Sequence, residues 1–201
     1  MTDTIAAIST AFGEGAIALL RLSGSRAVEI ADSVFRGKTS LKDAPSRAAQ
    51  FGTIEDRGQK LDEVLATAFR APGSYTGEDL VEIACHGGVL VTRRILEALL
   101  RQGARAADPG EFTQRAFING KMDLTQAEAV MDLISAQTDL ALRAANEQLE
   151  GRLGDRIRSL RETLLEMLAH VEAYIDFPDE DIDPETGGAL RRRIDQARDN
   201  V

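Results

Sequence analysis

Two opposite charges, Arg21 and Glu82, lie where the sequence is otherwise apolar. Arg21 interrupts the run Ala16–Ser23 and Glu82 interrupts Leu80–Cys85, and both runs have the length and composition of β-strands. Because a buried charge without a partner costs several kcal/mol, each residue needs an opposite charge, a ligand or water. The two residues therefore form an ion pair, lie at an edge open to water, or hold a polar small molecule.

These two groups suit a particular kind of ligand. A carboxylate accepts two N–H donors from an aminopyrimidinone-like ring, while a guanidinium or an ammonium holds a carboxylate or a carbonyl. The stretch Pro109–Leu124 brings Arg115, Asn119 and Lys121 close together at the junction between two halves of the chain. Domain junctions are favoured places for ligand sites, and the alternative is a hinge loop with solvated side chains.

A glycine turn, His86–Gly88, follows the strand that contains Glu82. Glycines allow close backbone approach, and a helix N-terminus favours an anion or a polar ligand, although a tight turn without a ligand fits the same pattern. His86 and His170 have no companion spacing typical of a metal site. Cys85 and His86 point to opposite faces of a strand. We therefore expect no catalytic residue and no metal ligand in this chain.

The elements that position these residues fall into two parts. Residues 1–120 alternate strand-like runs with two helical patterns, which predicts an α+β domain with a mixed β-sheet. We expect Ser25 to cap the first helix and Gly103 to end the second. The expected strands are Thr4–Ile8, Ala16–Ser23, Ala48–Ile54, Glu63–Arg70, Leu80–Cys85 and Ala104–Ala107, and the expected helices are Ser25–Phe35 and Gly88–Gln102.

Residues 121–201 have an almost wholly helical pattern. A capping-box match at Thr125–Glu128 predicts a helix start, and apolar residues from Leu149 to Ile175 form one stripe at helical spacing. We expect a single interruption, near Ser135–Thr138, a solvated acidic loop at Asp176–Glu185, and a last helical pattern from about Pro184. This last pattern cannot cover the stripe, so we expect a long-helix domain that is incomplete in an N-terminal piece of a longer protein.

Composition excludes several classes of function. The net charge of −9, an aromatic content of 4% and the absence of tryptophan argue against a large nucleic-acid footprint on this chain. No phosphate-binding G-x-x-x-x-G-K-[ST] motif and no membrane-length apolar run occur. A single cysteine fits a reducing compartment, so we expect a cytoplasmic protein without a membrane partner.

Several ordered motifs, taken together, resemble a known family. They are Asp3–Ser9, Gly13–Gly24, Ser74–Asp79, His86–Gly88, Pro109–Phe112, Arg115–Phe117, Lys121–Ala129 and Asp176–Glu180. In this order, and in register along essentially the whole chain, they resemble the N-terminal part of the bacterial tRNA-modification GTPases of the MnmE (TrmE) family. The resemblance implies a folate-binding domain similar in fold to the tetrahydrofolate-binding domain of the glycine-cleavage T-protein. It also implies the first part of a helical domain into which a Ras-like G domain is inserted.

The family's activity supplies further expectations. Members form homodimers through the N-terminal domain and bind a one-carbon tetrahydrofolate derivative, 5-formyl- or methylenetetrahydrofolate, near that interface. With the flavoprotein MnmG (GidA) they install a (carboxymethyl)aminomethyl group at C5 of the wobble uridine of certain tRNAs. GTP, magnesium and potassium act in the G domain, whose P-loop is missing from this sequence. GTP hydrolysis is therefore expected of the intact protein and not of this chain alone.

Carried over by motif, the folate contacts fall on Arg21, Glu82 and Lys121. Two of these are the charges that stand out in the apolar runs. Two other functions fit the sequence: a structural dimerisation scaffold, in which Arg21 and Glu82 pair and no folate binds, and a stand-alone one-carbon transferase like the T-protein.

Overall fold

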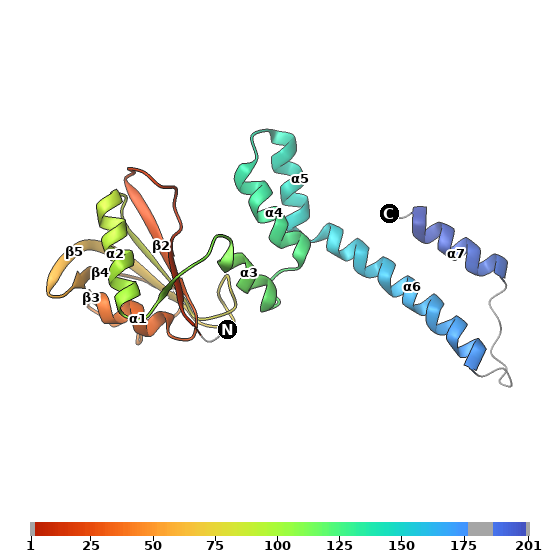
Figure 1. Ribbon diagram of the computed structural model, residues 1–201, viewed down its shortest axis with the longest axis horizontal. Helices are drawn as coiled ribbons and strands as arrows, with labels where there is room; N and C mark the ends of the chain where they lie inside the picture. The colour runs from red at the N-terminus through yellow and green to blue at the C-terminus, as the bar shows by residue number, and fades with distance from the viewer. Residues whose placement is uncertain (1–2, 177–186, 200–201) are drawn as a thin grey trace. The chain divides into compact units, whose positions relative to one another are not determined.

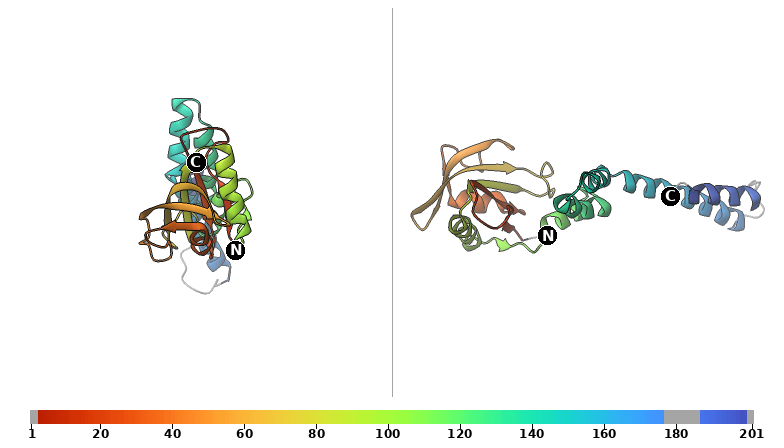
Figure 2. Two further views of the ribbon diagram at one scale, coloured as in Figure 1. Left: turned by 90° about the vertical axis from the view of Figure 1, so that its left-hand side faces the viewer. Right: turned by 90° about the horizontal axis from the view of Figure 1, so that it is seen from above.

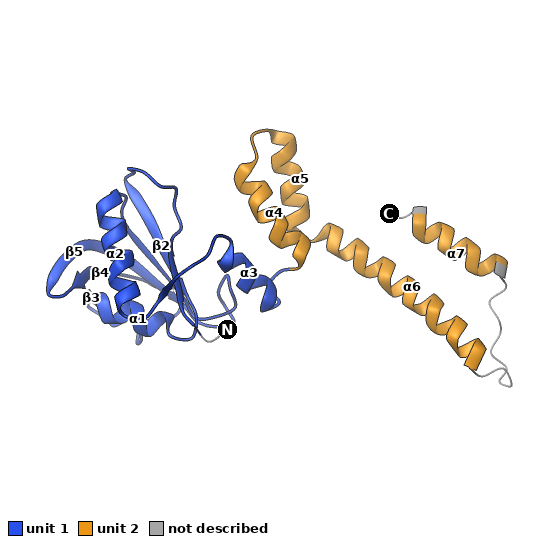
Figure 3. Ribbon diagram, viewed as in Figure 1, with its two compact units in different colours: residues 1–122 blue, residues 123–201 orange. Residues whose placement is uncertain are grey.

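The computed structural model describes residues 3–176 and 187–199. The chain divides into two compact units, residues 1–122 and 123–201 (Figure 3). The sequence patterns place this boundary at residue 120. Among the described residues, the first unit contains a β-sheet with helices and the second contains helices alone, so the expected α+β fold followed by a helical domain is confirmed (Figure 1).

A seven-stranded sheet forms the first unit, with the strand order β3-β4-β5-β6-β2-β1-β7. The strands are β1 (Ile5–Ile8), β2 (Ile17–Ser23), β3 (Phe35–Gly37), β4 (Ala49–Asp56), β5 (Gln59–Phe69), β6 (Leu80–His86) and β7 (Arg105–Ala106). Of the described strand pairs, β1–β7 is parallel and the others are antiparallel, so the sheet is mixed. Strand β3 is not predicted, because its three residues are too few to show an alternating pattern.

Two helices cover one face of this sheet (Figures 1 and 2), α1 (Ala27–Val34) and α2 (Val89–Arg101). Alternate residues of the central strands point toward these helices and form the core, because successive side chains of a strand point to opposite faces. The largest core side chains include Leu20, Leu22, Ile83, Ile95 and Leu99. This packing fixes which face of β2 and β6 carries Arg21 and Glu82, namely the face turned away from α1 and α2.

The predicted cap of α1 is wrong. The N-cap is Arg26 and not Ser25, and no side chain of its own caps the helix. Instead, the backbone N–H of Arg26 donates to Thr4 Oγ1 at 3.1 Å. The predicted end of α2 is confirmed, since Gly103 follows the C-cap with a φ of +103°. This left-handed conformation favours glycine because it has no Cβ.

The second face of the sheet is open over much of its area. Rows of paired residues cross it, and one row joins Phe51, Leu65, Ala84 and Leu19. Phe51 is 65% exposed and Ile17, farther along β2, is 71% exposed. We call this surface the open sheet face. Its apolar row lies beside the row that contains Arg21 and Glu82.

The stretch 109–124 is not the hinge loop that the alternative interpretation expects. Residues Glu111–Ile118 form helix α3, which begins after Gly110 with a φ of +76°. Arg115, in the middle of this helix, is 1% exposed. Its four carboxylate and carbonyl partners, described below, explain how a charge can be buried there.

The second unit contains α4 (Leu124–Ser135), α5 (Asp139–Leu149), α6 (Arg152–Asp176) and α7 (Gly187–Asp199). The expected interruption near residues 135–138 is confirmed. The expectation of a single interruption is wrong, because a second break at Glu150 and Gly151 separates α5 from α6, with Gly151 at a φ of +80°. Most of the predicted acidic loop, and Pro184, lie outside the described residues.

The predicted capping box of α4 is also wrong. Asp123 is the N-cap, its side chain accepts from the backbone N–H of Gln126 at 2.9 Å, and the Gln126 side chain accepts from the backbone N–H of Asp123 at 2.9 Å. The helix therefore begins two residues before the Thr125–Glu128 pattern predicts. None of the described helices has the length and apolar character needed to cross a membrane.

Candidate ligand site on the open sheet face

Arg21 and Glu82 lie opposite each other on neighbouring strands. They form a register pair of β2 and β6, and their side chains share the open sheet face. Arg21 Nη2 is 2.6 Å and Nε is 3.0 Å from the same oxygen, Glu82 Oε1. The side chains are 24% and 26% exposed, so each charge has a partner and retains access to solvent.

This geometry leaves two polar atoms available. Among the described residues, Glu82 Oε2 accepts no hydrogen bond and Arg21 Nη1 donates none, because the pair meets through a single carboxylate oxygen. A side-by-side pairing would have used both oxygens. The ion pair therefore presents one free acceptor and one free donor, which is the pattern that a ring with adjacent N–H and carbonyl groups requires.

Two aromatic rings flank the guanidinium of Arg21. Its Cζ atom lies 5.2 Å from the centroid of the Tyr75 ring and 5.8 Å from that of Phe112. Tyr75 lies in the loop between β5 and β6, residues 70–79, and Phe112 lies on α3. The Tyr75 hydroxyl is 2.8 Å from Thr113 Oγ1, which joins this loop to α3. Rings at these distances attract a cation and provide a flat, apolar surface.

Lys121 contacts the same loop at another position. Its Nζ donates to the carbonyl of Pro72 at 3.1 Å, and its side chain packs beside Gly77. It makes no hydrogen bond or ion pair with Arg21 or Glu82 among the described residues. Arg21 and Glu82 are thus brought together directly, whereas Lys121 is linked to them only through the loop that also contains Tyr75.

A cluster of charges with a buried centre lies next to this loop: Arg115 and Glu111 are buried, whereas the side chains of Asp3 and Arg105 are partly exposed. We call it the Arg115 cluster, and it consists of Asp3, Glu78, Arg105, Glu111 and Arg115. Hydrogen bonds from Arg105, and lesser ones from the backbone and from Arg115, hold the pKa of Glu111 down at about 2. Burial lowers the pKa of Arg115, but its bonds to Glu111 and Glu78 outweigh this and raise it. Both groups are therefore charged at neutral pH.

The turn at residues 86–88 packs against the backbone of residues 15 and 16, just before β2. Gly15 N–H donates to the carbonyl of Gly87 at 2.9 Å, and Gly87 N–H points to the carbonyl of Ala16 at 3.3 Å. A Cβ on Gly87 would collide with Gly15, so the glycine is required by this close approach. The tight-turn interpretation therefore fits this segment better than an anion site.

Cys85 and His86 occupy different surroundings, as their adjacent positions on a strand predict. Cys85 is buried on the helix-covered face, and burial, with a smaller effect of Asp62, raises the pKa of its thiol to about 11. His86 is exposed on the other face, where its Nδ1 lies 2.7 Å from Asp62 Oδ1. A buried neutral thiol and an outward-pointing imidazole do not form a nucleophile–base pair.

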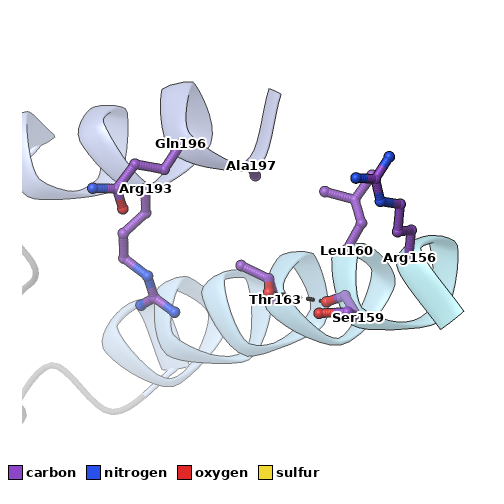
Figure 4. Close-up of a pocket in the computed structure, with 7 residues that line it drawn as sticks. All are labelled: Arg156, Ser159, Leu160, Thr163, Arg193, Gln196 and Ala197. Carbon is purple, nitrogen blue, oxygen red and sulfur yellow. Dashed lines mark hydrogen bonds between the residues drawn. The ribbon is translucent and has the colours of Figure 1, made fainter. Parts of the chain in front are cut away.

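The second unit has a cavity of its own, of about 350 Å³, between α6 and α7 (Figure 4). Its lining residues are Arg156, Ser159, Leu160, Thr163, Arg193, Gln196 and Ala197. Arg193 pairs with Glu166 at 3.6 Å. None of the residues expected to bind folate lines this cavity.

Sequence reasoning missed the aromatic part of the candidate site. Tyr75 and Phe112 belong to the two motif-rich stretches, but nothing in their local sequence shows that both rings meet Arg21. The sequence has few aromatic residues, seven phenylalanines and two tyrosines, and this scarcity is the signal that could have drawn attention to Tyr75 and Phe112. An aromatic residue in a glycine-rich polar loop has no core to fill, which favours a role at a site.

Comparisons with known proteins agree with this architecture. The family profile described as GTP-binding protein TrmE N-terminus matches residues 4–121, and the profile described as MnmE helical domain matches residues 124–201. The first match covers the sheet unit with its candidate site, and the second covers the helical unit.

Curated relatives carry the same family name, tRNA modification GTPase MnmE. The protein of Geobacillus thermodenitrificans is 52% identical over 204 residues, which cover 99% of this chain and 44% of the relative. That of Alkaliphilus metalliredigens is 53% identical over 190 residues, covering 92% and 41%. That of Bacillus velezensis is 54% identical over 183 residues, covering 89% and 40%. The chain spans less than half the length of these relatives. It belongs to the MnmE (TrmE) family of tRNA modification GTPases.

Proposed function

We propose that this chain is the folate-binding and dimerising part of a tRNA modification GTPase, and that it binds a one-carbon tetrahydrofolate derivative through Arg21, Glu82 and Lys121. One observation carries the proposal. The Arg21–Glu82 pair on the open sheet face leaves Glu82 Oε2 and Arg21 Nη1 without partners among the described residues, and two aromatic rings flank the guanidinium of Arg21.

The chemistry of the pterin ring matches these groups. Its aminopyrimidinone edge carries adjacent N–H donors for Glu82 and a carbonyl oxygen for Arg21. The rings of Tyr75 and Phe112 offer apolar surface near the same guanidinium. The ammonium of Lys121 donates to Pro72 and, within the part of the chain that the structure describes, has further donors for a carbonyl or carboxylate of the ligand.

Homodimerisation through the first unit is part of the proposal. Exposed Ile17, Phe51 and Leu65 on the open sheet face support it, since contiguous exposed apolar side chains mark association surfaces. A ligand beside such a surface would lie near the dimer interface.

The activity of the whole protein extends beyond this chain. We infer that the intact protein hydrolyses GTP in a G domain with magnesium and potassium, and acts with a flavoprotein of the MnmG type on the wobble uridine of tRNA in the cytoplasm. The support is the shared name of relatives that are about 52% identical and more than twice as long as this chain. In this arrangement the chain supplies the one-carbon donor.

A structural scaffold is the second candidate function. The Arg21–Glu82 ion pair favours it, because two hydrogen bonds already satisfy part of both charges. The pair is only about a quarter exposed, however, and the cost of desolvating both charges offsets much of their attraction, so stability alone is a weak reason to place two charges on an apolar sheet.

Isothermal titration with 5-formyltetrahydrofolate separates the two functions. We expect saturable binding to the 201-residue chain and a loss of roughly 5- to 150-fold in affinity for Glu82→Ala, the effect of removing one ligand hydrogen bond of about 1–3 kcal/mol. Urea unfolding should show that the variant remains folded.

Glu63→Ala is the matched control. Glu63 is a glutamate on β5 that forms an exposed ion pair with Lys60 at 2.7 Å, so it reproduces the loss of a paired carboxylate on the same sheet. Its affinity for the folate should equal that of the unchanged chain. Equal affinity in both variants would refute the site, and absence of binding to a folded chain would favour the scaffold.

A further inference from the structure

Arg115 is the most buried charge of the first unit, and it connects three segments. Its Nη1 donates to the carbonyl of Asp3 at 3.0 Å and to Glu78 Oε2 at 3.1 Å. Its Nη2 donates to Asp3 Oδ1 at 2.9 Å and to Glu111 Oε1 at 3.0 Å. One guanidinium thus joins the N-terminal segment, the 70–79 loop and α3.

The bond to Glu78 continues into a network that fixes the 70–79 loop. Ser23 Oγ donates to Glu78 Oε2 at 2.8 Å and lies 2.6 Å from Thr76 Oγ1. Asn119, at the end of α3, donates from Nδ2 to the carbonyl of Thr76 at 2.7 Å. The loop is therefore attached to β2 on one side and to α3 on the other, at the residues on both sides of Gly77.

The two segments that Arg115 joins are the ones that supply the aromatic rings. Tyr75 comes from the 70–79 loop and Phe112 from α3, one turn before Arg115. The bond between Tyr75 and Thr113 ties the same two segments together on the side of the rings. The Arg115 cluster and the ring pair are thus two attachments of one loop to one helix.

We propose that Arg115 is a positioning residue, which holds the 70–79 loop against α3 so that Tyr75 and Phe112 flank Arg21. Without its guanidinium, the largely buried carboxylates of Glu78 and Glu111 lose the cation that they share, and among the described residues Arg105 pairs with Glu111 but not with Glu78. Like charges repel strongly where water is scarce, so the loop and α3 separate. The consequence for a ligand rests on the proposed folate function, whereas the position of the rings does not.

Tyrosine fluorescence tests the position of Tyr75 without any ligand. The chain has no tryptophan and two tyrosines, Tyr75 and Tyr174, so Tyr174→Phe leaves Tyr75 as the only strong emitter. In that background we expect Arg115→Lys to increase acrylamide quenching of Tyr75 and to lower its anisotropy. A lysine keeps the charge but cannot donate in a planar fork to three partners at once.

Arg105→Lys is the matched control. Arg105 contacts Asp3 and Glu111 but forms no bond to Glu78 among the described residues, so it shares the ion pairs of the cluster without holding the loop. In the Tyr174→Phe background, we expect Arg105→Lys to leave the acrylamide quenching and the anisotropy of Tyr75 unchanged. This should hold even where urea unfolding shows that Arg105→Lys is less stable.

Glu78→Gln provides a second test that does not alter the arginine. It removes the charge that joins the loop to Arg115, so we expect the same direction of change in the Tyr75 signal. If Arg115→Lys does not fold, Glu78→Gln alone tests whether the bond between Arg115 and the 70–79 loop positions Tyr75. Unchanged quenching in a folded Arg115→Lys or Glu78→Gln chain, or an equal change in Arg105→Lys, would overturn the proposal.

Folate titration then gives the effect on the ligand. We expect a folded Arg115→Lys chain to lose roughly 2- to 30-fold in affinity for 5-formyltetrahydrofolate, as indirect couplings of this kind do. If the unchanged chain binds no folate, the proposed function fails, and the Tyr75 signal still decides whether Arg115 positions the ring. If folate binds and Arg115→Lys binds it equally well with unchanged quenching, the positioning role is refuted.

Discussion

Replacing Glu111 by glutamine should destabilise the first unit in a way that depends on pH. Glu111 is only 5% exposed, and its carboxylate accepts from Arg105 at 2.6 and 3.1 Å, from Arg115 at 3.0 Å and from the backbone N–H of Asp108 at 2.8 Å. These donors stabilise the ionised form, so the pKa falls from 4.5 to about 2, with the bonds to Arg105 as the largest cause.

The size of the effect follows from this pKa. Each pKa unit corresponds to about 1.4 kcal/mol, so the difference between 4.5 and about 2 is worth about 3 kcal/mol of folding free energy. Because the folded state has the lower pKa, this contribution is complete above 4.5 and is lost as the pH falls toward about 2. Near pH 3 about 1 kcal/mol of it should remain.

Urea unfolding at several pH values measures this contribution. With Tyr174→Phe as the background, the fluorescence of Tyr75 follows the first unit. We expect Glu111→Gln to be less stable by about 3 kcal/mol near pH 7, and the gap to shrink to about 1 kcal/mol near pH 3. A gap that stays constant with pH, or widens as the pH falls, would refute the argument that Glu111 is held ionised by its partners.

Two further predictions concern the helix start and the cysteine. Asp123→Ala should cost about 1–2 kcal/mol by removing the capping box of α4, whereas replacing Glu128, an exposed residue of the same helix, by alanine should change stability by no more than about 0.5 kcal/mol. Equal losses in urea unfolding would contradict this assignment. The thiol of Cys85, whose pKa burial raises to about 11, should react with a disulfide reagent near pH 8 only after urea unfolds the chain, and rapid labelling of the folded chain would contradict its burial.

The charged pair was predictable from sequence because its signal is local. A window of about eight residues is enough to recognise a charge inside an apolar strand, and both Arg21 and Glu82 can be recognised in this way. Their partnership could not be read in the same way. They are 61 residues apart, and only the register of β2 against β6 makes them opposite. The sequence therefore left open whether they pair with each other or hold a ligand.

Features that depend on packing were harder to predict. Whether the Tyr75 and Phe112 rings reach Arg21 depends on how the 70–79 loop and α3 meet, which no local pattern reports. The break at Gly151 was missed because the apolar stripe continues on both sides of it. The start of α4 was misplaced because Thr125 and Asp123 are both good caps, and the bonds to Gln126 decide between them.

A crystal structure of the chain with 5-formyltetrahydrofolate tests the central claim most directly. The measured quantity is the distance from the ring N–H donors of the ligand to the carboxylate of Glu82. We predict a hydrogen bond of about 2.7–3.2 Å to Glu82 Oε2, with the ring carbonyl at Arg21 Nη1. A folate bound elsewhere, or one that leaves Oε2 without a ligand partner, would contradict the account.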